Sequence, residues 1–251
     1  MDADTLAYRW RQSALQPIRF PSQILLADLL GIERQKVAAA QNARQFVLGR
    51  PANHMLLTGS RGTGKSSLVK ALLTEYARQG LRLVEVSPHD LLDLPDIVAP
   101  LRGRPERYVL YVDDFSVAAN DPALAALKAA LDGGIEEPPE NLLICATSNR
   151  RHLTPEFKRE NEEYRWDENE LHPGETTEEK IALSERFGLW LSFPPFDQNQ
   201  YLEVVRLHLA RFGVHDWNDE VRKLSLRWAL NRASRSGRVA QQFARDFAGK
   251  I

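Results

Sequence analysis

The residues best suited to do chemistry form one short glycine-rich stretch. Residues 59–66 read Gly-Ser-Arg-Gly-Thr-Gly-Lys-Ser and fill every fixed position of the phosphate-loop pattern G-x-x-x-x-G-K-[ST]. Glycines let the backbone adopt positive φ and approach a phosphate, so that successive amide groups point at the anion. The stretch therefore predicts a nucleoside triphosphate site, and the residues expected to contact the nucleotide are Gly59, Ser60, Arg61, Gly62, Thr63, Gly64, Lys65, Ser66 and Ser67.

Two of these residues have specific chemical roles in the prediction. Lys65 supplies a cation that reaches the β- and γ-phosphates, and Ser66 supplies a hydroxyl for Mg²⁺. The flanking sequence agrees, because residues 54–57 read as a short buried strand and residues 68–73 carry the apolar stripe of a helix that runs to about Gly80. That helix would direct its positive end at the phosphates. The alternative is a glycine-rich turn with an accidental lysine, and the strand–turn–helix context disfavours it.

A second group of candidate residues follows two other apolar runs. Residues 108–112 end in Asp113 and Asp114. We expect Asp113 to hold Mg²⁺, directly or through water, and Asp114 to polarise an attacking water. The alternative is a polar turn in which an aspartate caps a helix. The run 142–146 is soon followed by Asn149, whose amide we expect beside the Asp113 carboxylate, within reach of a water or a phosphate oxygen.

The elements that must position these residues alternate along the chain. Apolar runs that read as buried strands are separated mostly by helical patterns, which predicts a parallel sheet with helices on both faces. These runs are Met55–Leu57, Leu81–Val86, Tyr108–Val112, Leu142–Ala146 and Leu189–Phe193. After Pro194 and Pro195 only helical periodicity is visible. We therefore expect an N-terminal extension at 1–20, an α/β nucleotide-binding domain at 21–194 and a small all-helical domain at 195–251.

Composition excludes several classes of protein. The 251 residues are 43% hydrophobic, which suits one α/β domain with a small satellite. The formal net charge of -1 provides no general attraction to nucleic acid or membrane. The single cysteine, Cys145, cannot form an internal disulfide and lies in an apolar run, where we expect it to be buried. Without a signal peptide or a run of roughly 18 apolar residues, the expectation is a cytoplasmic protein with no membrane segment.

Charge is nevertheless distributed unevenly. Residues 156–179 hold ten acidic side chains against three basic ones, whereas residues 200–251 hold ten Lys or Arg against five Asp or Glu. The acidic region of one copy could attract the basic region of a neighbouring copy. Alternatively, the basic helices could contact the phosphates of a nucleic acid. The plainer interpretation is that both regions are ordinary solvated surfaces.

The order of the motifs resembles that of the AAA+ ATPases, and the closest match is the bacterial domain-of-unknown-function 815 family. The shared order is the phosphate loop, the strand ending in Asp113 and Asp114, the strand followed by Asn149, the sequence Ser-Glu-Arg-Phe-Gly at 184–188, and a helical lid carrying Ser-Gly-Arg at 236–238. The likeness runs from about Phe20 to the C-terminus. It implies an AAA+ fold in which residues 195–251 form the lid.

The resemblance also implies roles for individual residues. ATP with Mg²⁺ is the implied ligand, and Asn149 is similar to the sensor-1 residue. Arg186 resembles the arginine finger, which in AAA+ rings acts on the γ-phosphate of the neighbouring subunit, so a homo-oligomer is implied. Arg238 resembles sensor 2, which reaches the same phosphate from its own lid. Residues 30–33, including Ile32, resemble the segment that packs on the adenine.

Two function classes follow, and a third is weaker. The first is an ATPase that couples ATP binding and hydrolysis to movement of the lid or to assembly, acting on an unknown protein client. The second is a nucleotide-gated adaptor or loader that binds DNA or a replication protein, with little hydrolysis. Asp114 favours slow turnover, because many AAA+ proteins have a longer glutamate there. A metabolic kinase is disfavoured because residues 121–131 read as a plain helix and not as a substrate-binding insertion.

Overall fold

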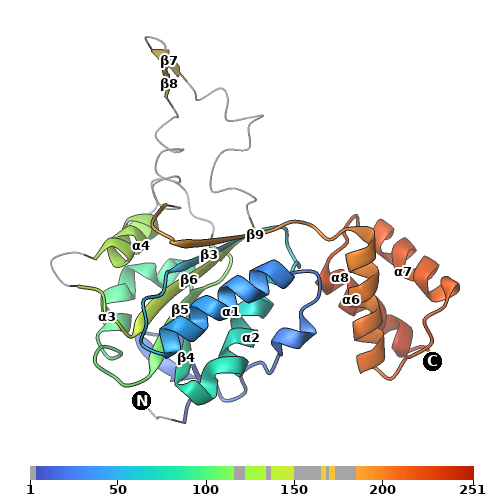
Figure 1. Ribbon diagram of the computed structural model, residues 1–251, viewed down its shortest axis with the longest axis horizontal. Coiled ribbons are helices and arrows are strands. Elements are labelled where there is room, and N and C mark those ends of the chain that lie inside the picture. The colour runs from blue at the N-terminus through green and yellow to red at the C-terminus, as the bar shows by residue number, and fades with distance from the viewer. Residues whose placement is uncertain (1–3, 116–121, 134–136, 150–164, 168–169, 173–184) are drawn as a thin grey trace.

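A computed structural model describes residues 4–115, 122–133, 137–149, 165–167, 170–172 and 185–251 (Figure 1). Its centre is a seven-stranded sheet in the order β2-β1-β4-β5-β6-β3-β9. The strands are β1 (Ala7–Arg11), β2 (Ala14–Pro17), β3 (Met55–Gly59), β4 (Leu81–Val86), β5 (Arg107–Val112), β6 (Leu142–Ser148) and β9 (Leu189–Phe193). All neighbours pair in parallel except β1 and β2. The five strands that the apolar runs predict are confirmed.

Helices cover both faces of the sheet, as predicted. α1 (Glu33–Val47) and α2 (Lys65–Tyr76) pack on one face, and α3 (Leu94–Val98) and α4 (Pro122–Asp132) pack on the other. Side chains of β5 alternate between the two apolar layers, because successive residues of a strand point to opposite sides. Short 3₁₀ turns connect these elements at η1 (Leu26–Asp28), η2 (Ala77–Gln79) and η3 (Pro88–Asp93).

The N-terminal residues join the central sheet, which the sequence patterns did not predict. β1 pairs in parallel with β4 and in antiparallel with β2, so this hairpin widens the sheet at its edge. The turn residues Gln12 and Ser13 both have positive φ, of 52° and 54°. Such hairpin turns usually contain Gly, Asn or Asp, and without those residues the sequence gives no hairpin signal. Trp10 anchors the hairpin by donating its indole N–H to Asp93 Oδ2 at 2.8 Å.

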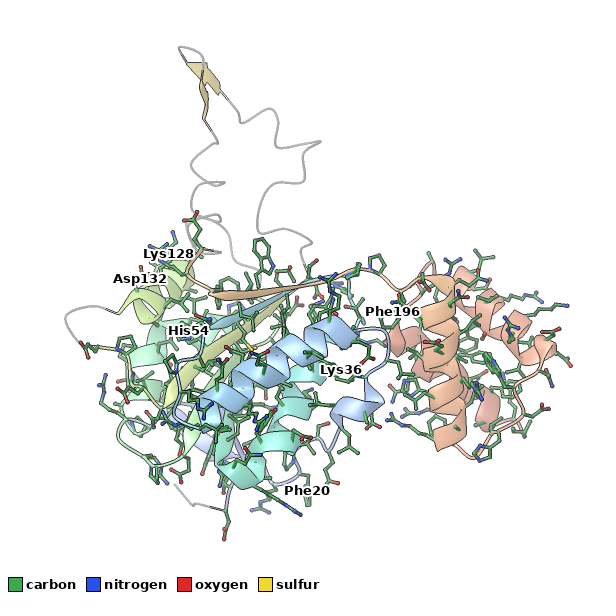
Figure 2. All side chains as sticks on the ribbon, in the orientation of Figure 1. Phe20, Lys36, His54, Lys128, Asp132 and Phe196 are labelled. Carbon is green, nitrogen blue, oxygen red and sulfur yellow. The ribbon has the colours of Figure 1, made fainter. Side chains whose placement is uncertain are left out.

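Three helices follow β9 and form the helical lid that the sequence predicts. They are α6 (Gln198–Arg211), α7 (Asp219–Asn231) and α8 (Gly237–Ala248), and they stand together beside the end of β9 (Figure 1). Each begins at a polar N-cap whose side chain accepts a backbone N–H: Asp197, Asn218 and Ser236. Phe196 is buried at the junction of sheet and lid (Figure 2), so one apolar layer continues from α2 into the lid.

The structure also addresses three other features of the sequence, which are Cys145, membrane-spanning segments and the acidic segment 156–179. Cys145 is fully buried, and burial raises the pKa of its thiol, so it behaves as a small apolar side chain. No helix in the described part of the chain combines the length and hydropathy needed to cross a bilayer. The acidic segment 156–179 lies outside the described residues, apart from a short hairpin of β7 (Arg165–Asp167) and β8 (Glu170–His172).

Candidate functional site

The phosphate loop joins β3 to α2, and its backbone has the conformation that the glycine pattern predicts. Gly59, Gly62 and Gly64 have φ of 129°, 72° and 102°. Gly59 also touches the neighbouring strand, since a Cβ built there would lie 2.1 Å from the Phe193 carbonyl oxygen. The Ser60 N–H donates to that same oxygen at 3.0 Å. Glycine is thus required at position 59 both for its φ and for its contact with β9.

Lys65 begins α2 and lies inside the loop. Its side chain is buried, and Nζ donates to the carbonyl oxygens of Gly59 and Ser60, at 2.8 Å each, and to Asn149 Oδ1 at 3.1 Å. Burial lowers the pKa of Lys65 to about 8, although Asp114 and Asp113 act in the opposite direction. All three acceptors are neutral oxygens. The ammonium group is therefore held where an anion entering the loop would supply its counter-charge.

Ser66 and Asp113 meet at the first turn of α2. Ser66 Oγ donates to Asp113 Oδ1 at 2.8 Å, and Thr147 Oγ1 donates to the same oxygen at 2.6 Å. Burial on its own would raise the pKa of Asp113, but hydrogen bonds from hydroxyls, first that of Thr147, together with the charge of Lys70, hold it below its usual value. An ionised carboxylate beside a serine hydroxyl is a donor set that suits Mg²⁺. The side chains present therefore fit the predicted metal.

Asn149 hydrogen-bonds to Asp114, which follows Asp113, the residue beside which the sequence predicts its amide. Its Nδ2 donates to Asp114 Oδ1 at 2.5 Å. Asp114 has a φ of 53°, and its backbone N–H donates to Thr147 Oγ1 at 3.0 Å. Thr147 thus satisfies Asp113 directly, and the left-handed turn brings the Asp114 carboxylate to the asparagine. Thr147 was missed as a site residue, although it lies only two residues before Asn149.

These groups line a cavity of about 560 Å³, a size typical of small-molecule sites. Most of the residues predicted for the site lie on its wall: Ile32, Arg61, Gly62, Thr63, Gly64, Lys65, Ser66, Ser67, Asp113, Asp114, Asn149 and Arg238. Apart from Thr147 of β6, the remaining wall comes from the segment before α1 and from the lid. Its apolar members are Ile24, Leu29, Leu30, Phe196 and Val204. The cavity therefore combines a charged end with apolar surface that suits a flat base.

The lid touches the phosphate loop directly. The Gly237 N–H donates to the Gly62 carbonyl oxygen at 2.7 Å, and a Cβ built on Gly62 would lie 2.9 Å from the Ser236 side chain. Ser236 also caps α8, so the first turn of that helix rests on the loop. Arg238 follows on the same turn, on the cavity wall. Its predicted role as a phosphate sensor stays a prediction.

Three charged or titratable residues of the wall were missed by the sequence analysis. Arg211 on α6 forms an ion pair with Asp28 in η1, which joins the lid to the segment before α1. His208 lies one helical turn earlier, and burial, assisted by Arg211, lowers its pKa to about 4. In the sequence these residues look like ordinary members of a solvated helix face. No local pattern marks a pair that forms only when the lid packs on the α/β domain.

Arg186 lies apart from this cavity. Its Nε is 2.7 and 2.6 Å from the two carboxylate oxygens of Asp132 at the end of α4, which Figure 2 shows on the opposite side of the sheet from α1. The next residue, Phe187, is buried, and Gly188 packs against Asn53. The residues that follow Arg186 are thus well packed. Among the described residues, those that line the cavity of the same chain do not include Arg186. Ser184, from the same motif, lies outside the described residues.

Comparisons with known proteins identify the fold. A point mutant of Thermotoga maritima RuvB has a TM-score of 0.60 and 15% identity, over 90% of this chain and 65% of that chain. The AAA domain of FIGL-1, solved in complex with ADP, has a TM-score of 0.57 and 19% identity, over 90% of this chain and 73% of that chain. The chain thus spans just under two thirds of the length of RuvB. No sequence among the curated proteins matches it significantly.

These structures are similar in fold, with the same α/β core followed by helices, and identities this low support nothing finer. A family model described as "Protein of unknown function (DUF815)" matches residues 3–251, which is nearly the whole chain. The protein therefore belongs to the DUF815 family and has the fold of the AAA+ ATPases.

Proposed function

We propose that this protein is a Mg²⁺-dependent ATPase of the AAA+ type, which assembles into a homo-oligomer and couples nucleotide turnover to movement of its lid. The observation that carries the proposal is the buried ammonium of Lys65, which is held by neutral oxygens inside a glycine loop. The segment before α1 and the lid provide the apolar surface for the adenine.

The phosphate loop would bind the triphosphate with its backbone N–H groups, and Lys65 would exchange contacts with carbonyl oxygens for contacts with phosphate oxygens. Ser66 and Asp113 would hold the metal, since they are already joined by a hydrogen bond at 2.8 Å. Bound there, Mg²⁺ would supply positive charge against the β- and γ-phosphates. The contribution of the protein at this end of the cavity is to position charge rather than to react covalently.

Hydrolysis needs a water in line with the γ-phosphate. In the proposal Asp114 orients that water, and Asn149 fixes Asp114 by donating to its carboxylate. Arg238 would stabilise the developing charge from the lid of the same chain. Arg186 would do so from a neighbouring chain, because it is held by Asp132 outside its own cavity. Asp114 has one methylene fewer than glutamate, which places the carboxylate closer to its backbone and favours slow turnover.

Movement of the lid follows from contacts on both sides of the cavity. The lid rests on the phosphate loop through Gly237 and Gly62, and it meets the segment before α1 through Arg211 and Asp28. A nucleotide lying between these contacts would alter both of them. ATP binding would therefore bias the angle between lid and sheet.

The test is to measure mass in solution and phosphate release by the purified protein, with no nucleotide, with ADP and with a slowly hydrolysed ATP analogue. The expected result is Mg²⁺-dependent release of phosphate and a larger assembly with the analogue. Failure to bind any nucleoside triphosphate contradicts the proposal as a whole. Binding without turnover at any protein concentration contradicts the ATPase part and leaves a nucleotide-gated adaptor.

That adaptor is the second candidate, and an exposed basic surface on the lid favours it. Lys223, Arg227 and Arg235 are exposed on or just after α7, where phosphates of a nucleic acid would reach them. Affinity for DNA should then fall steeply with salt. A flat dependence at low salt argues against this candidate.

A further inference from the structure

Tyr111 is a buried residue next to the predicted metal site, and it has no part in the proposed binding of nucleotide or hydrolysis. It lies on β5 two residues before Asp113, so both side chains point to the α2 face of the sheet. The side chain is 1% exposed, and its hydroxyl is close to the Asp113 carboxylate and the Ser66 hydroxyl. A phenol is ordinarily protonated at neutral pH, so the hydroxyl is a donor, and the Asp113 carboxylate is within its reach.

The hydroxyl nevertheless lacks a hydrogen bond of good geometry. Within the described residues, Tyr111 Oη and Trp228 Nε1 are the two fully buried side-chain polar atoms without such a partner. A buried donor left unsatisfied is costly, whereas phenylalanine would fill the same space without that cost. The hydroxyl is therefore not needed for packing in this state of the protein.

The Asp113 carboxylate is the group that the hydroxyl can reach. Its Oδ1 already accepts hydrogen bonds from Ser66 and Thr147, so a further donor must meet the carboxylate from another direction. Asp113 lines the cavity and would turn slightly when it shares a cation with the Ser66 hydroxyl. A small rotation of this kind would let the neighbouring phenol improve its contact with a carboxylate oxygen, a contact that falls short of a hydrogen bond of good geometry in the structure.

We propose that Tyr111 is a positioning residue for Mg²⁺, whose hydroxyl donates to Asp113 in the metal-bound form and thereby strengthens metal binding. The inference rests on the proposed function, since it assumes that Ser66 and Asp113 hold the metal. Groups that orient metal ligands usually change metal affinity by about 10- to 100-fold when they are removed. Tyr111 is thus expected to set how much Mg²⁺ the nucleotide site requires.

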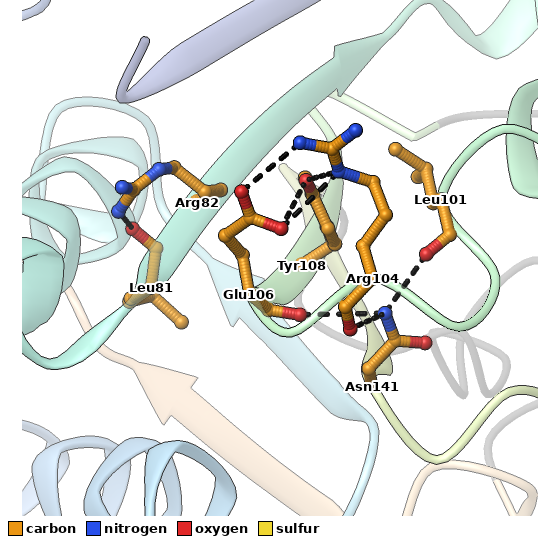
Figure 3. A network of polar contacts seen from close by, with 7 residues as sticks. All are labelled: Leu81, Arg82, Leu101, Arg104, Glu106, Tyr108 and Asn141. Atoms are coloured by element: carbon orange, nitrogen blue, oxygen red, sulfur yellow. Dashed lines mark hydrogen bonds and ion pairs between the residues drawn. The ribbon is translucent and has the colours of Figure 1, made fainter. Parts of the chain in front are cut away.

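The same strand offers a matched control (Figure 3). Tyr108 is also buried on β5, but it points to the opposite face, where its hydroxyl accepts from Arg104 Nε at 2.9 Å and donates to Glu106 Oε2 at 3.2 Å. Asn141 closes this network by donating to the carbonyl oxygens of Leu101, Arg104 and Glu106. Tyr108→Phe therefore removes a tyrosine hydroxyl from β5 without touching Asp113.

The experiment compares wild type, Tyr111→Phe and Tyr108→Phe by two measurements. The first is the affinity for a fluorescent ATP analogue as Mg²⁺ is titrated from an EDTA-treated start, and the second is the melting temperature in EDTA. Tyr111→Phe should need about 10-fold more Mg²⁺ for half-maximal tightening. Its affinity in EDTA should equal that of wild type, and its melting temperature should be equal or higher. Tyr108→Phe should leave the Mg²⁺ requirement unchanged.

Each other outcome overturns the inference in a recognisable way. An unchanged Mg²⁺ requirement in Tyr111→Phe, with or without a lower melting temperature, leaves the hydroxyl only an ordinary structural role. A wild type whose nucleotide affinity ignores Mg²⁺ overturns the metal site of the proposed function as well. Adding Tyr111→Phe to an Asp113→Asn variant should cause no further loss of affinity in Mg²⁺, and a further loss shows that Tyr111 does not act through Asp113.

Discussion

The side-chain amide of Asn149 donates to the Asp114 carboxylate. The oxygen of the same amide accepts from Lys65 Nζ at 3.1 Å, so the orientation of the amide is fixed from both sides. The residue proposed to orient water is thereby tied to the residue proposed to bind phosphate. In the proposed function, a phosphate that drew Lys65 away would free one side of Asn149, and the site would thereby respond to the presence of the nucleotide.

Removal of the Asp114 charge should separate binding from turnover. Asp114→Asn fits the backbone, because asparagine tolerates the φ of 53° at this position. We expect unchanged affinity for ATP and phosphate release that falls by about 100-fold or more, since a positioned base contributes at least that much. Asp96→Asn, at an exposed site on α3, is the control and should behave as wild type. Undiminished hydrolysis would show that another group orients the water.

Lys65→Ala should abolish retention of a labelled ATP analogue in a filter assay. The variant loses a charge-assisted contact that the rest of the loop cannot replace, and a loss of affinity of about 100-fold is expected. Lys128→Ala on α4, which packs on the other face of the sheet, tests whether any lost lysine has this effect. Retention equal to wild type would exclude the phosphate-loop assignment.

Arg186→Ala should reduce phosphate release by about 1000-fold while affinity for ATP stays the same, because an arginine finger acts on the transition state. Asp132→Asn removes an ion-pair partner of Arg186. Both side chains are partly exposed, at 30% and 45%, so the stability should change by less than about 1 kcal/mol. A loss of ATP affinity in Arg186→Ala would show that Arg186 contacts the nucleotide bound to the same chain.

Complementation tests whether the finger acts between chains. The Lys65→Ala chain lacks a working phosphate loop but retains Arg186, and the Arg186→Ala chain has the reverse defect. Mixed assemblies should recover part of the phosphate release, with a maximum at an intermediate ratio. If every ratio gives only the sum of the two separate rates, the arginine does not serve a neighbour.

His54 makes the folding stability of the protein depend on pH. Its Nδ1 accepts the Ile144 N–H at 3.0 Å, which only the neutral ring is able to do, and burial lowers its pKa below 6.5. The unfolded chain therefore binds this proton more readily than the folded one. The contribution of His54 to the free energy of unfolding is fully present above about pH 6.5 and declines as the pH falls below that value. Urea unfolding from pH 7 to 5 should show a smaller decline for His54→Asn, which keeps an acceptor that does not titrate. The exposed His215→Asn should keep the wild-type slope.

Local patterns were sufficient for the main features of the fold. The phosphate loop, the strand before Asp113 and the lid helices depend on glycine geometry, apolar runs and caps that lie within a few residues of each other. The hairpin of β1 and β2 was missed because its turn, Gln12 and Ser13, lacks the usual residues. The pair of Asp28 with Arg211 was missed because it depends on the packing of the lid. The partner of Asn149 depends on the backbone turn at Asp114, which no pattern of side chains reveals.

The contact between the Gly237 N–H and the Gly62 oxygen gives the lid its own reporter. A single amide proton is shielded from solvent for as long as α8 rests on the loop, and it is released when the lid swings away. In the proposed function, its rate of exchange with deuterium would therefore report lid opening, and the rate could be measured with each nucleotide.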